Sequence, residues 1–318
     1  MTVSSRLFDA DGTDQAVDVD STPLDQLTDR QLLWVDIEGT DERELRAVTD
    51  ALGVAPESVR TLLGPDREPR LDFVGDYFEI TVVALDEHEK PLVLDLLAGK
   101  NWVATVHSAP VPFLGEFRQR LAPDTELGVL TAPSFLAALL DWQVGTYFAG
   151  VDRLGQAVDD LDDRAFQAKG RENLARDLIR LRRRIGAVRR TLTPHREVFA
   201  ALARPDFEVI ASSESAAHYR ALVDRLERAI GAVENVRELL IGSFDILMTQ
   251  VGQQTNDVMR TLTIITVILL PAAVLAGVMG MNFSVGFFDE PAMFWVVVGS
   301  MVLVGVIVLL VARLKHWI

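Results

Sequence analysis

The chain has no cysteine among its 318 residues, which excludes a disulfide framework and thiolate metal sites. It also lacks a Walker-type loop and a GxGxxG motif, so nothing indicates ATP coupling. The first 20 residues are acidic and contain no apolar core of the signal-peptide type, so no cleaved signal peptide is expected. The spacing of the five histidines matches neither a metal site nor an acid–base pair, so nothing in the sequence indicates an enzyme. The histidines are His88, His107, His195, His218 and His316.

Basic residues are scarce in the first third of the chain. Residues 1–100 carry 23 Asp or Glu against 9 Lys or Arg, which accounts for nearly all of the net charge of −15. Such a surface argues against nucleic acid as a partner. It either concentrates cations or simply keeps a domain soluble, and charge alone does not decide between these two interpretations.

Two long uncharged runs stand near the C-terminus. After Arg260 no charged residue occurs until Asp289, and a second uncharged run covers residues 292–312. About 20 apolar residues cross a hydrocarbon core roughly 30 Å thick, so both runs can span a bilayer. We expect the first span at about 261–281, an external loop at 283–291, the second span at 292–312 and a tail at 313–318.

The charges that flank these spans predict their orientation. Arg260 precedes the first span, and Arg313, Lys315 and His316 follow the second, whereas the loop carries Asp289 and Glu290 and no basic residue. The positive-inside rule therefore places both termini in the cytoplasm. Arginine outnumbers lysine 27 to 4, as is typical of GC-rich bacterial genomes, so a multi-pass protein of a bacterial plasma (inner) membrane is expected.

The N-terminal part alternates strand-like and helix-like patterns. Strands are predicted at 32–37, within 70–85, at 92–97 and at 101–107, and helices at 41–52, with Thr40 as N-cap, and after Pro56. We expect residues 1–130 to form a cytoplasmic α+β domain with a mixed sheet.

Helical patterns then continue to the membrane. Residues 131–211 predict a long helical hairpin, with an aspartate-rich helix at 134–167 and an arginine-rich helix at 171–203. These charges favour either complementary packing of the two helices or two solvated faces. Residues 212–282 contain no proline before Pro271 and predict one stalk helix, about 105 Å long, that continues into the first span.

One line of this helix carries small or weakly polar side chains. These residues recur at alternating spacings of three and four and form what we term the small-residue stripe: Asn256, Met259, Thr263, Thr266, Leu270, Ala273, Gly277 and Gly280, with Leu262 at its edge. The stripe indicates either a pore wall or an ordinary helix-packing contact. Two helices cannot enclose a water-filled path, so a pore would require several chains.

The first span ends on Gly280-Met281-Asn282, followed by a short loop and one last apolar helix. In this arrangement, together with Asn256-Asp257-Val258-Met259, the chain resembles the CorA family of magnesium and cobalt transport proteins. The resemblance implies a homopentamer in the lipid bilayer with the first span of each chain around the axis. It also implies a selectivity filter for hydrated Mg²⁺ at Gly280, Met281 and Asn282, and a gate formed by Met259, Leu262 and Leu270, with Asn256 as a polar ring.

The resemblance also implies regulation by Mg²⁺ bound between cytoplasmic domains. Asp224 and Asp245 are the candidate ligands, because hard cations take oxygen ligands. Ala221 stands where relatives often have an acid, so the site is either weakened or relocated, for example to Asp86, Glu87 and Glu89. Asp289 and Glu290 either attract cations to the outer mouth or are solvated loop residues.

These features predict a gated divalent cation channel that takes up Mg²⁺ down the membrane potential, with Co²⁺ or Ni²⁺ as further ions. One alternative is a proton-coupled Zn²⁺ carrier similar to the ZntB branch of the superfamily. Met281 favours the magnesium branch, and zinc prefers nitrogen and sulfur ligands, yet the small-residue stripe contains no Cys and no His. The second alternative is a membrane-anchored scaffold without ion flux.

Overall fold

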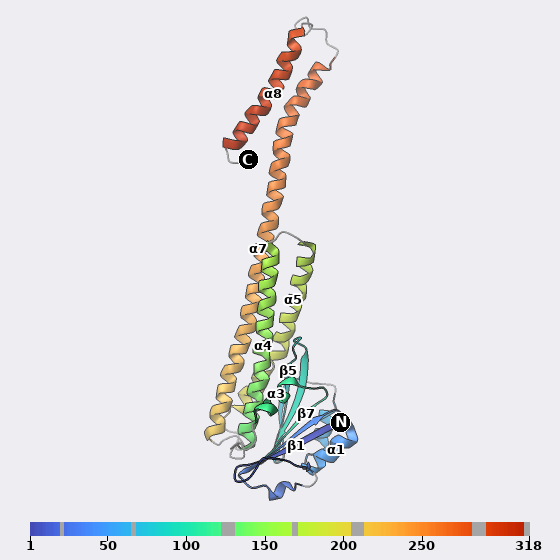
Figure 1. Cartoon of the computed structure of the whole chain (residues 1–318), viewed down its shortest axis with the longest axis vertical. Helices are drawn as coiled ribbons and strands as arrows, with labels where there is room; N and C mark the ends of the chain where they lie inside the picture. Colours follow the sequence, from blue (N-terminus) through green and yellow to red (C-terminus); the bar gives the residue numbers. More distant parts are fainter. Residues whose placement is uncertain are drawn as a thin grey trace. The chain divides into compact units, whose positions relative to one another are not determined.

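The computed structural model describes residues 1–19, 22–64, 68–121, 131–166, 171–204, 213–281 and 291–314. The chain consists of two compact units, Met1–Ser243 and Phe244–Ile318. The first unit contains a sheet and the helices that cover it, and the second contains the two apolar helical segments (Figure 1).

A seven-stranded sheet forms the centre of the first unit. Its order is β2-β1-β3-β7-β6-β5-β4, and of its neighbouring strands only β3 and β7 run parallel. The predicted mixed sheet is therefore confirmed. The strands are β1 (Thr2–Asp9), β2 (Gln15–Ala16), β3 (Gln31–Glu38), β4 (Arg70–Val74), β5 (Tyr77–Leu85), β6 (Pro91–Ala98) and β7 (Trp102–His107).

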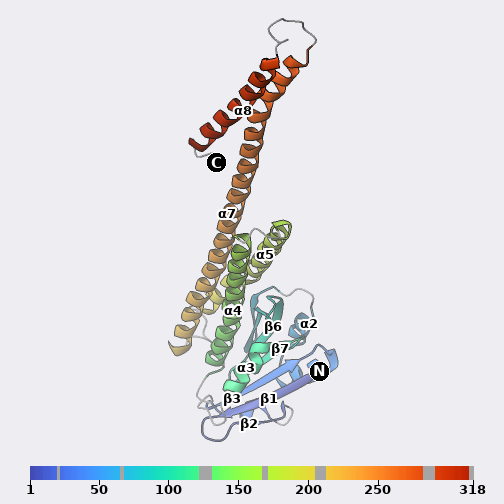
Figure 2. The same cartoon turned by 45° about the horizontal axis from the view of Figure 1, so that its top comes forward.

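Helices cover both faces of the sheet because both faces are apolar. On one face, α1 (Glu42–Ala51) and α2 (Pro56–Leu62) bury Leu45 and Val59 against alternate residues of β3 and β7. On the other face, Phe135 lies 5.6 Å from Trp34 and 5.6 Å from Phe117, ring centre to ring centre. Phe117 belongs to α3 (Pro112–Arg120) and Phe135 to α4 (Ala132–Phe166), so these helices form the third layer. Figure 2 shows α3 and α4 beside the strands.

Helix α4 continues beyond the sheet and packs against α5 (Arg171–Leu192). The prediction of one helix over 171–203 is wrong, because α5 ends at Leu192 and a separate α6 covers His195–Leu202. Pro194 lies between them, and a proline inside a helix removes one backbone hydrogen bond and clashes with the preceding turn. The break turns His195 inward, where its side chain is fully buried.

Two local predictions at the N-terminus need correction. The cap of α1 is Asp41 rather than Thr40, since Asp41 Oδ1 accepts hydrogen bonds from the amides of Arg43 (3.0 Å) and Glu44 (3.1 Å). The carboxylate offers two acceptor oxygens at a position where backbone donors are unpaired. The sequence also did not reveal β1, whose residues are mostly polar and of which only Leu7 and Phe8 are buried.

Helix α7 runs from Ser213 to Met279 with Pro271 inside it, and α8 runs from Pro291 to Leu314. Both contain a segment long and apolar enough to cross a membrane, and none of either segment is buried inside the chain. The predicted continuation of the stalk into an apolar span therefore has its counterpart in α7. Asn282, Asp289, Glu290, Lys315 and His316 lie outside the described residues.

Candidate pore helix and regulatory carboxylates

The small-residue stripe lies on the second unit's part of α7 and is uncovered within one chain. The side chains of Met259 and Leu262 are each 56% exposed, and that of Leu270 is 62% exposed. The other members of the stripe from Asn256 to Gly280 are likewise exposed. Since no part of the described chain packs on this line, lipid or further protein must cover it.

The threonines of the stripe satisfy their own hydrogen-bond donors. Thr263 Oγ1 donates to the carbonyl oxygen of Met259 and Thr266 Oγ1 to that of Leu262, each at 2.8 Å. Each hydroxyl hydrogen therefore points back along the helix, and the oxygen lone pairs remain as acceptors. A line of such oxygens can contact water molecules around a cation.

Helix α7 ends where the predicted filter begins. The amide of Gly280 donates to the carbonyl of Ala276 at 2.9 Å, and that of Met281 donates to Val278 at 3.2 Å in a tighter turn. Gly280 and Met281 thus stand at the helix terminus, where the last carbonyls lack partners within the helix. Asn282 lies outside the described residues, so its role stays a prediction.

The predicted regulatory carboxylates do not form a metal site within one chain. Asp224 and Asp245 are exposed on α7 and lie 21 residues apart in sequence. Among the described residues, no group of three or more Asp, Glu or His side chains is placed to hold a metal ion. A site that uses Asp224 or Asp245 would therefore need ligands from another chain.

The turn with Asp86, Glu87 and Glu89 is held by internal contacts. Asp86 Oδ1 accepts from the amides of His88 and Lys90, both at 2.7 Å. Glu89 is buried in a left-handed conformation (φ 56°), and its carboxylate binds Arg153 at 3.1 Å and Arg184 at 2.6 Å. Two guanidinium groups compete with any cation for Glu89, so this carboxylate is a poor metal ligand.

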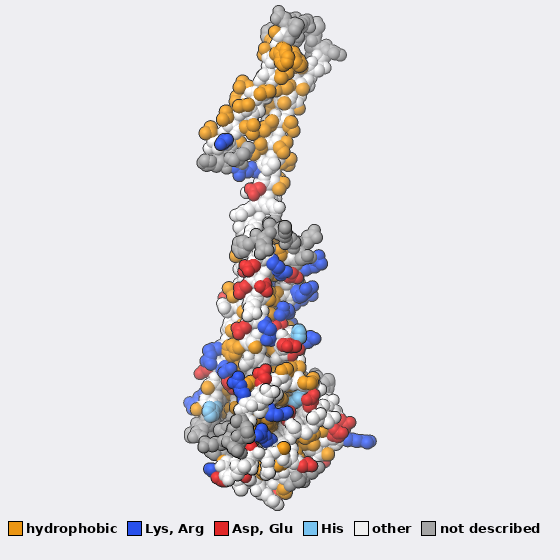
Figure 3. All heavy atoms as spheres, viewed as in Figure 1, with side chains coloured by type: hydrophobic (Ala, Val, Ile, Leu, Met, Phe, Trp, Pro, Cys, Tyr) orange, Lys and Arg blue, Asp and Glu red, His pale blue; other side chains and the backbone are white. Residues whose placement is uncertain are grey.

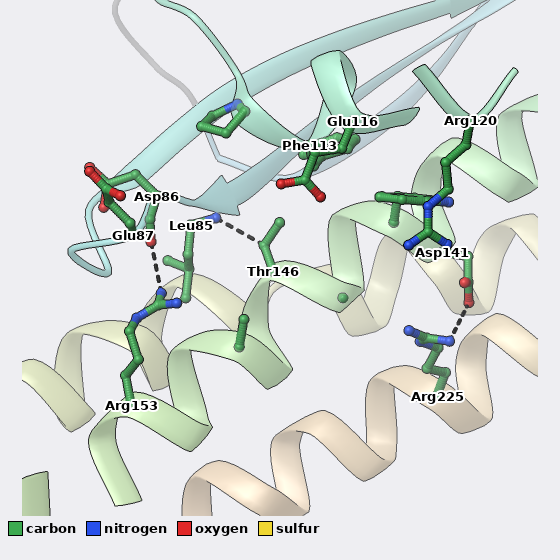
Figure 4. A pocket seen from close by; sticks show the side chains of 14 residues that line it. Leu85, Asp86, Glu87, Phe113, Glu116, Arg120, Asp141, Thr146, Arg153 and Arg225 are labelled. Atoms are coloured by element: carbon green, nitrogen blue, oxygen red, sulfur yellow. Dashed lines mark hydrogen bonds and ion pairs between the residues drawn. The ribbon is translucent and has the colours of Figure 1, made fainter. Parts of the chain in front are cut away.

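A pocket of about 550 Å³ beside this turn is lined by residues of the β5–β6 turn, α3, α4 and α7. Figure 4 shows Arg153 directed toward Asp86, whose carbonyl accepts from Nη2 at 3.0 Å, and Arg225 paired with Asp141 at 3.1 Å. Arg120 lies 4.9 Å from the ring centre of Trp142. These three arginines offset the acidic lining, so the pocket is unsuited to a bare divalent cation. Periodicity in the sequence did not indicate it, because its walls come from four separate elements.

Two buried histidines serve the domain rather than a metal. His107 Nε2 lies 3.1 Å from Asp36, which also binds Arg118 Nη2 at 2.5 Å. Burial by itself would lower the pKa of His107, but its hydrogen bond and attraction to Asp36 outweigh burial and raise that pKa. His195 instead accepts a hydrogen bond at Nε2 from the amide of Val83 (3.0 Å), and burial lowers its pKa to about 4.

The layered α/β domain is followed by one long helix that ends in an apolar segment and by a second apolar helix, both long enough to cross a membrane. This is the arrangement expected of a membrane protein with a large domain outside the bilayer. A model of the CorA-like Mg²⁺ transporter protein family matches residues 29–313. The chain therefore belongs to this family, whose members are transporters rather than enzymes.

Individual relatives agree with this assignment. The chain is 26% identical over 298 residues to the cobalt/magnesium transport protein CorA of Thermotoga maritima, covering 90% of this chain and 83% of that protein. It is 25% identical over 281 residues to the zinc transport protein ZntB of Photorhabdus laumondii, covering 82% and 81%. The fold matches the complete structure of the CorA magnesium transporter from Methanocaldococcus jannaschii with a TM-score of 0.82 at 21% identity, covering 100% of this chain and 99% of that one.

Proposed function

We propose that several copies of this chain, five by the family resemblance, assemble in a bacterial plasma membrane around a gated path for Mg²⁺. The observation that carries the proposal is the exposed small-residue stripe on α7. Within this family, placing that line of each copy around a common axis covers it and creates a path that one chain cannot enclose. In this arrangement α8 surrounds the α7 spans, and both termini, with the N-terminal domain, the helical hairpin and the stalk, lie in the cytoplasm.

The chemistry of the stripe suits a hydrated cation. Mg²⁺ holds its water tightly, so neutral oxygen acceptors that bind those waters are favourable, whereas a dehydrating cage is not. Thr263 and Thr266 offer such oxygens because their hydrogens are engaged within the helix. Met259, Leu262 and Leu270 would form apolar constrictions that close by dewetting, and Asn256 a polar ring below them.

We place the selectivity filter at Gly280-Met281-Asn282 and cation attraction at Asp289 and Glu290. The Asn282 amide oxygen and an accessible Gly280 carbonyl would receive the hydrated ion at the outer mouth. A divalent cation that moves inward through 100 mV gains about 4.6 kcal/mol, so the membrane potential suffices as driving force. An open path would dissipate that potential, and a gate is therefore needed.

Intracellular Mg²⁺ would close the gate by binding between copies. Asp224 and Asp245 are exposed and available to a neighbouring chain. Replacing either with Ala should weaken inhibition by internal Mg²⁺ and leave maximal flux unchanged, because neither residue lies in the apolar span. Flux is measured into proteoliposomes at increasing internal Mg²⁺, with Asp50→Ala as a control at an exposed aspartate on α1. An inhibition curve that does not move in either variant would remove that residue from the regulatory site.

Proteoliposomes loaded with dyes for Mg²⁺, Zn²⁺ and pH test the proposal as a whole. An imposed inside-negative potential should drive Mg²⁺ influx that grows with the potential and leaves the internal pH unchanged. Co²⁺ and Ni²⁺ are then compared by competition. The protein used must have a verified oligomeric mass, and the internal Mg²⁺ must be low. If none of these ions then moves, the result contradicts the proposal and favours a scaffold.

The likeness to the zinc transport protein ZntB supports a second candidate, a proton-coupled Zn²⁺ carrier. Zn²⁺ prefers nitrogen and sulfur ligands, and the stripe offers only the Met259 thioether. The same proteoliposomes separate the two functions. Zn²⁺ influx that requires a proton gradient would assign the carrier.

A further inference from the structure

A line of arginines runs along the outer surface of α5. Arg176, Arg180, Arg183 and Arg190, together with the neutral Ala187, fall on one side of the helix, opposite its buried leucine and isoleucine side chains. We term these five residues the arginine stripe. Its arginines are exposed, and Figure 3 shows basic side chains gathered over α5. Of the four arginines, Arg180 lies 3.6 Å from Asp177 of its own helix. Within the described part of the chain, the other three form no side-chain hydrogen bond or ion pair.

A matching acidic line lies on α4. Asp152, Asp159 and Asp163, with the neutral Gln156, are exposed on the side opposite the buried Leu154, Val158 and Leu161. We term these four residues the aspartate stripe. Charged residues repeat at intervals of seven in both stripes, from Asp152 to Asp159 and from Arg176 through Arg183 to Arg190. This interval is about 10.5 Å along each helix, so the charges can face one another in register.

The two stripes do not neutralise each other within the chain. Among the described residues, the ion pair that joins α4 to α5 is Arg164–Asp177 at 2.9 Å. In this pair the aspartate-rich α4 supplies the arginine and the arginine-rich α5 supplies the aspartate. α4 nevertheless carries six aspartates against two arginines, and α5 eight arginines against two acids. The hairpin is thus held by its apolar faces and presents two surfaces of opposite charge outward.

A closed ring of more than two identical chains joins two different surfaces of each chain at every interface. We propose that the arginine stripe of one copy docks on the aspartate stripe of the next copy. This inference rests on the proposed homo-oligomer and adds a contact to it. Exposed ion pairs contribute little stability each, so the stripes would set the register and neighbour choice of the ring rather than hold it together.

The absence of native cysteine allows a direct test. Gln156→Cys and Ala187→Cys place one thiol in each stripe without removing any charge. The two full-length variants are co-expressed with different affinity tags, purified as mixed oligomers and treated with a mild oxidant. A disulfide needs Cα atoms within roughly 7 Å. We expect a disulfide-linked dimer that carries both tags, and little dimer from either variant alone. Ala175→Cys, which is also exposed on α5 but lies outside the arginine stripe, replaces Ala187→Cys as the matched control and should not form the mixed dimer.

Charge exchange tests the chemistry of the contact. Arg183→Asp in the Ala187→Cys chain should reduce the mixed dimer several-fold, and Asp159→Arg in the Gln156→Cys chain should restore it. An oligomer of verified mass without the mixed dimer would overturn the stripe contact and leave the proposed function intact, whereas a monomer would contradict both. A third result would also overturn the contact: the parent pair forms no mixed dimer, and Arg183→Asp loses binding to anionic lipid vesicles. That result would assign the arginine stripe to lipid.

Discussion

Replacing Asn282 with Ala should abolish Mg²⁺ flux while the oligomer still assembles. In the proposed filter each copy contributes one amide oxygen that accepts hydrogen bonds from the hydrated ion. A hydrogen bond to a charged partner contributes about 1.5–3 kcal/mol, and the ring would lose one from every copy at once. We therefore expect influx to fall by roughly 100-fold or more. The measurement is dye-reported Mg²⁺ influx into proteoliposomes at a fixed inside-negative potential.

Assembly is checked by the mass of the detergent-purified oligomer. Gln254→Ala is the control, because it removes an exposed side-chain amide of α7 that lies outside the small-residue stripe. This variant should retain measurable flux. Wild-type flux in Asn282→Ala would remove the filter from Gly280-Met281-Asn282, and equal loss in both variants would show that the effect is not specific to the filter.

Acidification should destabilise the N-terminal domain through His195. Nε2 of this ring accepts from the Val83 amide and Nδ1 donates to the Leu192 carbonyl at 3.1 Å, so the histidine is neutral. Burial lowers its folded-state pKa to about 4, below the value of 6.5 expected for the unfolded chain. The unfolded state therefore binds the extra proton first, and stability falls as the pH drops from about 6.5 to 4. The loss should reach about 3 kcal/mol across this interval.

Other shifted groups affect mainly different pH intervals. Because the pKa of His107 is raised, its contribution to the free energy of unfolding is fully present below pH 6.5 and is lost only at higher pH. Burial opposes ionisation of Asp36, but its hydrogen bonds to His107 and Thr105 and the charge of Arg118 lower its pKa, so its contribution fades only below about pH 3.8. Burial raises the pKa of Glu79, so protonation of this carboxyl in the folded state has the opposite effect on stability just above pH 4.5.

Chemical unfolding of the full chain, followed by tryptophan fluorescence at several pH values, measures the effect. His195→Gln keeps an acceptor for Val83 but cannot take up the proton. This variant should be less stable at neutral pH and should lose less stability on acidification. An equal pH slope in the two proteins would show that another group is responsible.

The parts of the fold that the sequence predicted follow from strong periodicity. Residues 32–37 are apolar except for Asp36 and form the centre of β3. The uncharged runs after Arg260 and Pro291 correspond to the apolar segments of α7 and α8. Local chemistry was harder to rank. Thr40 and Asp41 are both good caps, and only the hydrogen bonds that Asp41 accepts from the amides of Arg43 and Glu44 identify the cap of α1. Pro194 was a visible breaker, but the apolar pattern on both sides of it favoured one helix.

The candidate site divides in the same way. The stripe on α7 could be read from spacing, and the structure places it on an uncovered line of that helix. The turn at Asp86 could not be judged from composition. Three acids in four residues predict a cation site, yet Glu89 is engaged by Arg153 and Arg184, which come from helices more than 60 residues later. Only tertiary packing reveals such competing partners.

The single parallel pair of the sheet has a consequence for how the domain folds. Strands β1–β3 form one antiparallel ribbon, and β4–β7 form another from a contiguous segment joined by short turns. Each ribbon can form early, because its contacts are close in sequence. Joining β3 to β7 must close a loop over the 63 residues between Glu38 and Trp102, which costs chain entropy before any contact is gained. Pairing of β3 with β7 is therefore the step at which the two ribbons become one domain. Substitutions at the facing pair Val35 and Ala104 should slow folding more than substitutions of equally buried residues within either ribbon.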